Sequence, residues 1–240
     1  MTNFVSQWKE KCLVSDNPVT QRQFIFQKYY EDLFRPFGKN RQTIVEIGCG
    51  RCTIGQYFAK DGKSVECLDI SQEAVDLARI NFERAGLRGT FTRADALHLP
   101  LGRYDRKFKD AVVSVGLIEH LETGEWQRCL SEAYRILRPG GVLAMVNVPK
   151  KFSIQTFFQK HDHYHREALI PEDYVRACVQ IGFRAVKYVY VNPFPLLETK
   201  HELFWSRVFR AVYWVRSWFT KQPMCGSKRW SQAHFLMAIK

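Results

Sequence analysis

From residue 43 onward, short apolar runs alternate with segments of helical periodicity, and this alternation limits the folds that are open to the chain. The helical segments end at turn signals such as Asp61-Gly62 and Gly86. Strands that alternate with helices indicate βαβ units and a parallel sheet. The sequence therefore predicts an α/β domain with strands at 43–47, 64–70, 90–95, 110–115 and 142–148.

The length and the cysteine content set the broad class of the protein. A chain of 240 residues suits one domain with an appendage. No run approaches the ~20 apolar residues of a membrane span, and the first residues do not resemble a signal peptide. The seven cysteines are scattered from Cys12 to Cys225, which does not suggest a disulfide framework. These features predict a cytoplasmic protein in a reducing environment.

The net charge of +12 is concentrated toward the C-terminus. Residues 184–240 hold ten basic and two acidic residues, a net of +8, whereas the remaining residues hold 26 basic and 22 acidic ones, a net of +4. This asymmetry favours a polyanionic neighbour, either nucleic acid or an anionic membrane surface.

The segment EIGCGRC, which follows the first predicted strand, permits two interpretations. Cys49 and Cys52 form a C-x-x-C pair, as in a redox dithiol or half of a zinc site. Gly48 and Gly50 form a G-x-G turn, which lets the backbone approach a nucleotide closely. Zinc would need a second ligand pair at a matching spacing, and the sequence holds no other C-x-x-C or C-x-H pair.

The next acidic residue favours the nucleotide interpretation. Asp69 ends the second predicted strand, 21 residues after Gly48, where an acid accepts hydrogen bonds from ribose hydroxyls. The redox interpretation has no second anchor of this kind and is the less favoured alternative. Thr53 stands where a dinucleotide-binding G-x-G-x-x-G turn has its third glycine, which argues against NAD.

The stretch VEIGCGRCT resembles motif I, E-x-G-x-G-x-G, of the class I S-adenosylmethionine-dependent methyltransferases, although Cys52 stands where the family usually has glycine. The similarity continues in order along the chain. RADALHLP resembles the family's g-D-A-x-x-L-P segment, DAVVSVGLIEHL its fourth-strand motif and AYRILRPGGVLAMVNV its x-x-R-x-L-K-P-G-G-x-L signature. The resemblance covers residues 40–190 and 233–240, and its nearest relatives act on quinone precursors, lipids and small metabolites.

This resemblance implies a Rossmann-like, doubly wound sheet of seven strands, mostly parallel with an antiparallel last strand, and S-adenosyl-L-methionine as the cofactor. In that family pattern Asp69 holds the ribose hydroxyls, Asp95 accepts from the adenine amino group and the N–H of Ala96 meets the ring. The implied cofactor-binding residues are Glu46, Gly48, Cys49, Gly50, Asp69, Ile70, Asp95, Ala96, Ser114 and Val115.

The regions outside the resemblance divide the chain further. Residues 1–42 are predicted to form a helical N-terminal extension that packs on the domain or closes over a ligand. Residues 43–191 and 233–240 form the predicted methyltransferase domain, and residues 192–232 an aromatic, basic helical insertion. The insertion is the main departure from the family, because a short hairpin normally joins its last two strands.

Methyl transfer from a sulfonium mainly requires that acceptor, methyl and sulfur are aligned, with a base only where the acceptor must lose a proton. The candidate bases are Glu119 and His120 after the fourth strand, His163 within HDHYH, and Tyr29 and Tyr30 in the N-terminal helical segment. Glu119 and His120 also fit a role in folding their loop. The histidines of residues 161–165 also fit a solvated linker, the lining of an acceptor pocket or a metal site, but no metal is predicted.

Residues 202–219 have helical periodicity and combine aromatic with basic residues. Three interpretations stay open. The helix either caps the core with its basic face solvated, contacts a membrane surface or a hydrophobic acceptor, or binds RNA through arginine and stacking aromatics. The predicted broad apolar face consists of Phe204, Trp205, Val208, Phe209, Val212, Val215 and Phe219.

Together these features predict a methyltransferase that transfers a methyl group from S-adenosylmethionine to a small or lipid-like acceptor. The alternative is a non-catalytic or RNA-directed protein of the same fold that docks on RNA or on an anionic membrane. Peripheral membrane contact belongs to the hypothesis, nucleic acid is the less favoured partner, and no oligomeric state is predicted.

Overall fold

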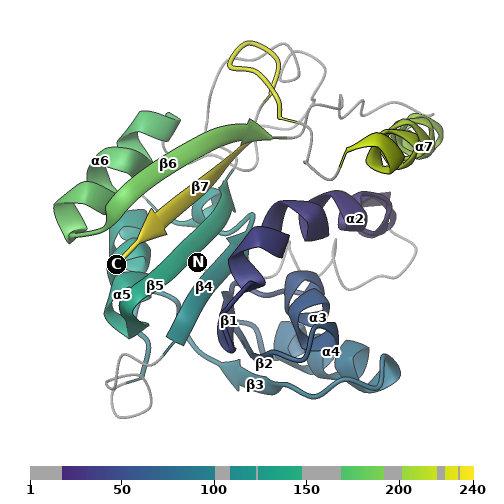
Figure 1. The fold of residues 1–240 in the computed structure, drawn as a ribbon. Coiled ribbons are helices and arrows are strands. Elements are labelled where there is room, and N and C mark those ends of the chain that lie inside the picture. The colour runs from purple at the N-terminus through teal and green to yellow at the C-terminus, as the bar shows by residue number, and fades with distance from the viewer. Residues whose placement is uncertain are drawn as a thin grey trace.

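The computed structural model describes residues 18–100, 109–122, 124–147, 169–191, 202–220, 225–231 and 233–240. At its centre lies a seven-stranded sheet in the order β3-β2-β1-β4-β5-β7-β6 (Figure 1). β7 runs antiparallel to both of its neighbours, β5 and β6, and the other described pairings are parallel, so the predicted Rossmann-like sheet with one antiparallel last strand is confirmed. The strands are β1 (Thr43–Ile47), β2 (Ser64–Asp69), β3 (Thr90–Arg93), β4 (Lys109–Val115), β5 (Leu137–Asn147), β6 (Arg184–Val191) and β7 (Ala233–Ile239).

The order of the strands places the site. The chain adds β2 and β3 on one side of β1 and then crosses to add β4 and β5 on the other side. Ile44 pairs with Ala111 and Glu46 pairs with Val113, so the carboxyl ends of β1 and β4 lie side by side. The connections after these two strands leave in opposite directions, and ligands bind at such a switch point in open α/β sheets.

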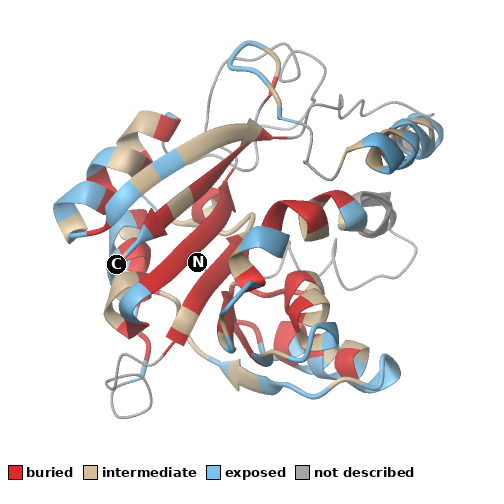
Figure 2. Ribbon diagram, viewed as in Figure 1, coloured by how far each residue is buried: buried red, intermediate tan, exposed pale blue. Residues whose placement is uncertain are grey.

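Helices cover both faces of the sheet, and the inner strands β1, β2, β4, β5 and β7 are mostly buried, whereas the edge strands β3 and β6 are partly exposed (Figure 2). Alternate strand residues contribute to opposite faces: Ile44 belongs to one core cluster, whereas Val45 and Ile47 belong to the other. The first cluster receives side chains from α2 (Pro18–Gly38), α3 (Thr53–Lys60), α4 (Gln72–Arg84) and α7 (Glu202–Phe219), and the second from α5 (Glu125–Ile136) and α6 (Pro171–Ile181).

The strand β5 begins earlier than the sequence predicts. The segment Pro139-Gly140-Gly141 was expected to break the chain before a strand at 142, but it lies within β5. Lys109 pairs with Leu137, and a register shift follows in the pairing with β4. The end of the chain closes the other side, because Gly140 N–H donates to Lys240 O at 2.9 Å and Lys240 N–H donates to Gly141 O at 3.0 Å. Because neighbouring segments bond to it on both sides, β5 continues through the segment Pro139-Gly140-Gly141.

The described part of the N-terminal extension is the helix α2, which packs on the domain. Phe34 is fully buried, and its ring centroid lies 5.0 Å from that of Phe235 in β7. Tyr29 is buried as well, with its ring centroid 5.4 Å from that of Tyr213 in α7. Helix α2 thus links the sheet to α7, which lies beside it in Figure 1.

Helix α7 has the predicted bounds, but most of its predicted apolar face is exposed rather than packed on the core, namely Phe204, Trp205, Val212, Val215 and Phe219. Arg207 and Arg210 are exposed as well. Tyr213 is the buried anchor, and its hydroxyl donates to Asp32 Oδ2 of α2 at 2.9 Å. Trp214, Trp218 and Phe219 are 54%, 64% and 83% exposed. None of the described helices combines the length and the apolar character needed to cross a membrane.

Candidate active site

The turn after β1 has the backbone conformation that its glycines imply. Gly48, Gly50 and Cys52 all have positive φ, at 59°, 49° and 54°. The turn is held by the N–H of Cys49, which donates to Leu68 O of β2 at 2.9 Å. A Cβ at position 48 would lie 2.7 Å from Leu117 Cδ1, so the segment after β4 packs directly on the turn. Glycine at 48 is required both by its φ and by this close approach.

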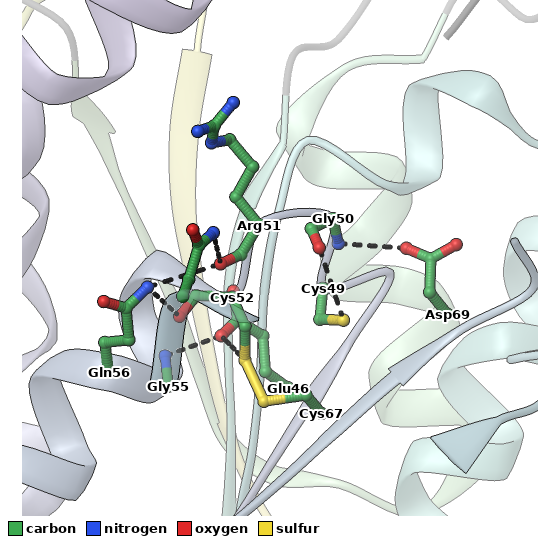
Figure 3. Close-up of a disulfide and its surroundings, with 10 residues drawn as sticks. Glu46, Cys49, Gly50, Arg51, Cys52, Gly55, Gln56, Cys67 and Asp69 are labelled. Atoms are coloured by element: carbon green, nitrogen blue, oxygen red, sulfur yellow. Dashed lines mark hydrogen bonds between the residues drawn. A yellow bond between two sulfur atoms is a disulfide. The ribbon is translucent and has the colours of Figure 1, made fainter. Parts of the chain in front are cut away.

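Asp69 lies beside the turn, as its spacing predicted. Its Oδ2 accepts from the N–H of Gly50 at 3.0 Å (Figure 3), and its Oδ1 accepts from the N–H of Ser71 at 2.9 Å. Burial raises the pKa of Asp69, and the hydrogen bonds from Ser71 and Gly50 oppose that rise. Each carboxylate oxygen retains a further lone pair, so the group can also accept from two vicinal hydroxyls.

Glu46 is buried near the end of β1 and fixes the start of α3. Its Oε2 accepts from the N–H of Gly55 at 2.6 Å and lies 3.1 Å from Cys52 Sγ. Burial raises the pKa of Glu46 to about 8. These contacts show a side chain that positions the turn and the helix, while its predicted contact with the cofactor stays a prediction.

The cysteines depart from the sequence analysis, which expected no disulfide. Cys52 is bonded to Cys67 of β2, across a Cα–Cα distance of 6.3 Å and a sequence separation of 15 residues. Cys49, its neighbour in the C-x-x-C pair, is a buried free thiol whose pKa is raised by that burial. The spacing search missed this bond because the register of two parallel strands creates it: Cys67 lies opposite Glu46, where the turn folds back over the end of β1.

Two further cofactor candidates lie at the same edge of the sheet with different exposure. Asp95 follows β3, its side chain is 33% exposed, and its Oδ1 accepts from the N–H of Leu97 at 2.9 Å. Ser114 is buried, and its hydroxyl donates to Ile47 O at 2.9 Å, so it ties β4 to β1. The residues Ile70, Ala96 and Val115 stand in the segments that follow or end β2, β3 and β4.

The catalytic candidates are divided between described and undescribed parts of the chain. Glu119 and His120 lie in the short 3-10 helix Ile118–His120 after β4. Glu119 is buried, and its Oε1 would lie 3.3 Å from a Cβ at Gly116, so it folds back over the end of that strand. His163 lies outside the described residues. Within the described ranges, no group of three or more His, Cys, Asp or Glu side chains is placed to hold a metal ion.

Comparison with known proteins decides between the families that this geometry allows. Residues 44–141 match the family described as a methyltransferase domain. This region is a class I S-adenosylmethionine-dependent methyltransferase domain. The match begins in β1 and includes the glycine turn, Asp69 and Asp95. The matched range thus contains the turn that resembles motif I of this family, with a bonded cysteine at the position where glycine is usual.

Relatives of the methyltransferase domain include two with quinone-related names. The chain is 34% identical over 159 residues to 2-methyl-6-phytyl-1,4-hydroquinone methyltransferase 2, chloroplastic, of Oryza sativa subsp. japonica, covering 65% of this chain and 42% of that one. It is 25% identical over 184 residues to a ubiquinone biosynthesis O-methyltransferase of Dinoroseobacter shibae, covering 70% and 71%. The chain therefore spans less than half the length of the rice relative.

A solved structure shares the fold of the methyltransferase domain at low sequence identity. Phosphoethanolamine N-methyltransferase 2 of Haemonchus contortus, in complex with S-adenosyl-L-methionine, superposes with a TM-score of 0.65 at 17% identity, covering 98% of this chain and 59% of that one. At this identity the likeness concerns the fold.

Proposed function

We propose that the methyltransferase domain binds S-adenosylmethionine at the glycine turn and transfers its methyl group to a lipid-like acceptor of the hydroquinone or phenol class. The observation that carries this proposal is the hydrogen bond between Gly50 N–H and Asp69, which joins the turn to the acid that the family uses for ribose. The names of the rice and Dinoroseobacter relatives support the acceptor class.

The proposed role of the residues of this site is to bind the cofactor and to align its methyl group for displacement from the sulfonium. The bound cofactor supplies an activated methyl group. Asp69 accepts hydrogen bonds from the ribose hydroxyls, and Gly48 and Gly50 allow the backbone to approach the ligand. Asp95 and the N–H of Ala96 are the proposed adenine contacts. Where the acceptor is a phenol, Glu119 or His120 is the proposed base for the hydroxyl proton.

The activity is tested with the full chain, S-adenosylmethionine and three acceptors: a polyprenyl hydroquinone in detergent micelles, the same head group without the chain, and single-stranded RNA. We expect a product heavier by one methyl group from the polyprenyl acceptor and less from the short one, measured by mass spectrometry. Cofactor binding without any product would support the non-catalytic alternative, and methylated RNA the RNA-directed one.

We further propose that α7 brings the protein to an anionic membrane surface, where such acceptors reside. Its aromatic side chains Phe204, Trp205, Trp214, Trp218 and Phe219 are exposed, and the ring centroids of Trp214 and Trp218 lie 4.4 Å apart. Residues 203–240 contain seven lysines and arginines and no acidic residue. Exposed aromatics next to arginines on a helix are typical of an interfacial helix, in which apolar insertion and charge attraction act together.

Replacing Trp214 and Trp218 with serine should remove the part of vesicle binding that survives high salt, because ring insertion is insensitive to screening. Replacing Arg207 and Arg210 with glutamine should weaken the salt-sensitive part by about 1 kcal/mol each. Both are measured by flotation with phosphatidylglycerol-containing vesicles over a range of salt concentrations.

A matched control removes exposed apolar residues elsewhere. Ile80 in α4 and Val179 in α6 are 41% and 58% exposed, and their double change to serine should leave vesicle binding intact. Tighter binding to single-stranded RNA than to vesicles, with a steep dependence on log salt, would contradict the membrane proposal and favour RNA.

A further inference from the structure

The disulfide sits at the junction of the two segments that form the cofactor site. Cys52 ends the glycine turn and is the N-cap residue of α3, while Cys67 lies two residues before Asp69 in β2. Besides the hydrogen bond from Cys49 N–H to Leu68 O, the turn and the strand are therefore joined by the hydrogen bond from Gly50 N–H to Asp69 and by the bond between the two sulfurs (Figure 3). A change at the disulfide therefore acts on the same two segments that form the hydrogen bond between Gly50 and Asp69.

The disulfide constrains Cys52, whose backbone has an unfavourable conformation. Cys52 has φ 54° and ψ 47°, the left-handed conformation, and makes no side-chain cap hydrogen bond. Residues with a Cβ adopt this conformation at a cost of about 1–2 kcal/mol, whereas the other turn residues with positive φ are glycines. The bond to Cys67 holds Cys52 in a conformation that a free cysteine at this position disfavours.

Glu46 contacts the sulfur of Cys52, so its hydrogen bonding depends on whether that sulfur is a thiol or part of a disulfide. Its Oε2 lies 3.1 Å from Cys52 Sγ and accepts from the N–H of Gly55 in α3. A thiol at Cys52 would donate its proton to this carboxyl oxygen, whereas the sulfur of a disulfide carries no proton. Reduction thus changes both the conformational constraint on the turn and the hydrogen bonding of the group that holds α3.

We propose that Cys52 and Cys67 are a reversible thiol–disulfide pair that sets the affinity of the turn for the cofactor. This inference rests on the proposed function for the identity of that cofactor. In the forward direction the two thiols react with one molecule of a small-molecule disulfide such as oxidised glutathione. A sulfur–sulfur bond forms between Cys52 and Cys67, the disulfide of the oxidant is cleaved, and two molecules of its thiol leave with both protons.

The direction of the effect follows from pre-organisation. With the disulfide formed, the turn already has the geometry that brings Gly50 to Asp69, so less ordering is needed on binding. Both sulfurs are fully buried, so exchange requires that the turn opens, although its residues Arg51 and Thr53 are partly exposed. A bound cofactor holds the turn closed and should therefore slow reduction.

The first test compares S-adenosylhomocysteine affinity by calorimetry in oxidised and reduced protein, with the Cys52–Cys67 link followed by mass spectrometry of peptides. We expect reduction to weaken binding about fivefold, the equivalent of the low end of the left-handed strain. Cys67→Ala should bind like the reduced protein in both conditions. Cys52→Gly should be insensitive to reductant and bind at least as tightly as the oxidised protein, because glycine tolerates positive φ.

Controls separate this pair from other thiols and from the function itself. Cys225 is an exposed free cysteine, and Cys225→Ser should respond to reductant like the wild type. Equal affinity before and after verified reduction would overturn the inference but leave the proposed function standing, whereas binding in neither state would overturn the proposed function. Amide hydrogen exchange of residues 48–55 needs no ligand, and unchanged exchange on reduction would overturn the inference independently.

A third measurement follows because the coupling between the disulfide and cofactor binding must act in both directions. If the disulfide tightens cofactor binding fivefold, the cofactor must favour the disulfide by the same factor in a glutathione redox buffer. The oxidised fraction of the pair should therefore increase when S-adenosylhomocysteine is added. No shift in that fraction, with the ligand bound, would contradict the coupling.

Discussion

Replacement of Asp69 by alanine is expected to weaken S-adenosylhomocysteine binding by about 1.5–3 kcal/mol, or roughly 10- to 150-fold. The change removes the acceptor for the ribose hydroxyls and also the acceptor that holds Gly50 N–H and Ser71 N–H. Asp69→Asn should lose less, because one oxygen acceptor remains. Titration calorimetry on the full chain measures both values.

An acid on the next helix provides the control for this change. Asp76 is exposed on α4 and accepts a hydrogen bond from Gln72 at 2.9 Å. Asp76→Ala removes a carboxylate of the same charge near the same edge of the domain and should leave affinity unchanged. Wild-type affinity in Asp69→Ala, or binding of NAD in place of S-adenosylhomocysteine by the unaltered chain, would contradict the assignment of the site.

Stability should fall as the pH rises between about 5 and 8, and Glu46 should account for much of the loss. Burial raises the pKa of Glu46 from its ordinary value of 4.5 to about 8. Between these values the unfolded chain has released the proton that the folded chain still holds, so deprotonation favours unfolding. At pH 8 this penalty reaches about 4 kcal/mol. Asp69, whose pKa burial also raises, contributes with the same sign.

The measurement is urea unfolding of the wild type and of Glu46→Gln at several pH values in this interval. Glutamine keeps an oxygen for the N–H of Gly55 and cannot ionise, so the variant should be less dependent on pH and more stable than the wild type near pH 8. Wild-type stability that is constant or rises over the interval would show that Glu46 is ionised in the folded protein.

The fold was largely predictable because its signals are local. The apolar run 43–47 appears in the structure as the expected strand, and helix α4 buries Ala74, Val75, Ala78 and Phe82. Ser71 is the N-cap residue of that helix, and its hydroxyl accepts from Ala74 N–H at 3.3 Å. The glycine turn and Asp69 also came together as predicted, because strand pairing fixes the distance between the ends of β1 and β2.

The details that escaped prediction depend on contacts between distant segments. The partner of Cys52 is set by the pairing of β1 with β2, and the burial of Ser114 by its hydrogen bond to Ile47 O. The periodicity of α7 identified a helix, but the predicted apolar face is mostly exposed, because the helix is held through Tyr213, which donates to Asp32, and through Phe209. Sequence spacing carries no information about such choices.

The position of β7 has a consequence for the order in which the molecule is assembled. β7 follows β6 in the sequence but lies between β5 and β6, which do not pair with each other. Until residues 233–239 have been synthesised, β5 presents an unpaired edge and β6 has no place in the sheet. At ordinary rates of translation the interval between β6 and β7 lasts roughly 2 to 8 s. During that time the nascent chain exposes two strands that can pair with other chains, so the ribosome-bound intermediate should be a preferred client of chaperones.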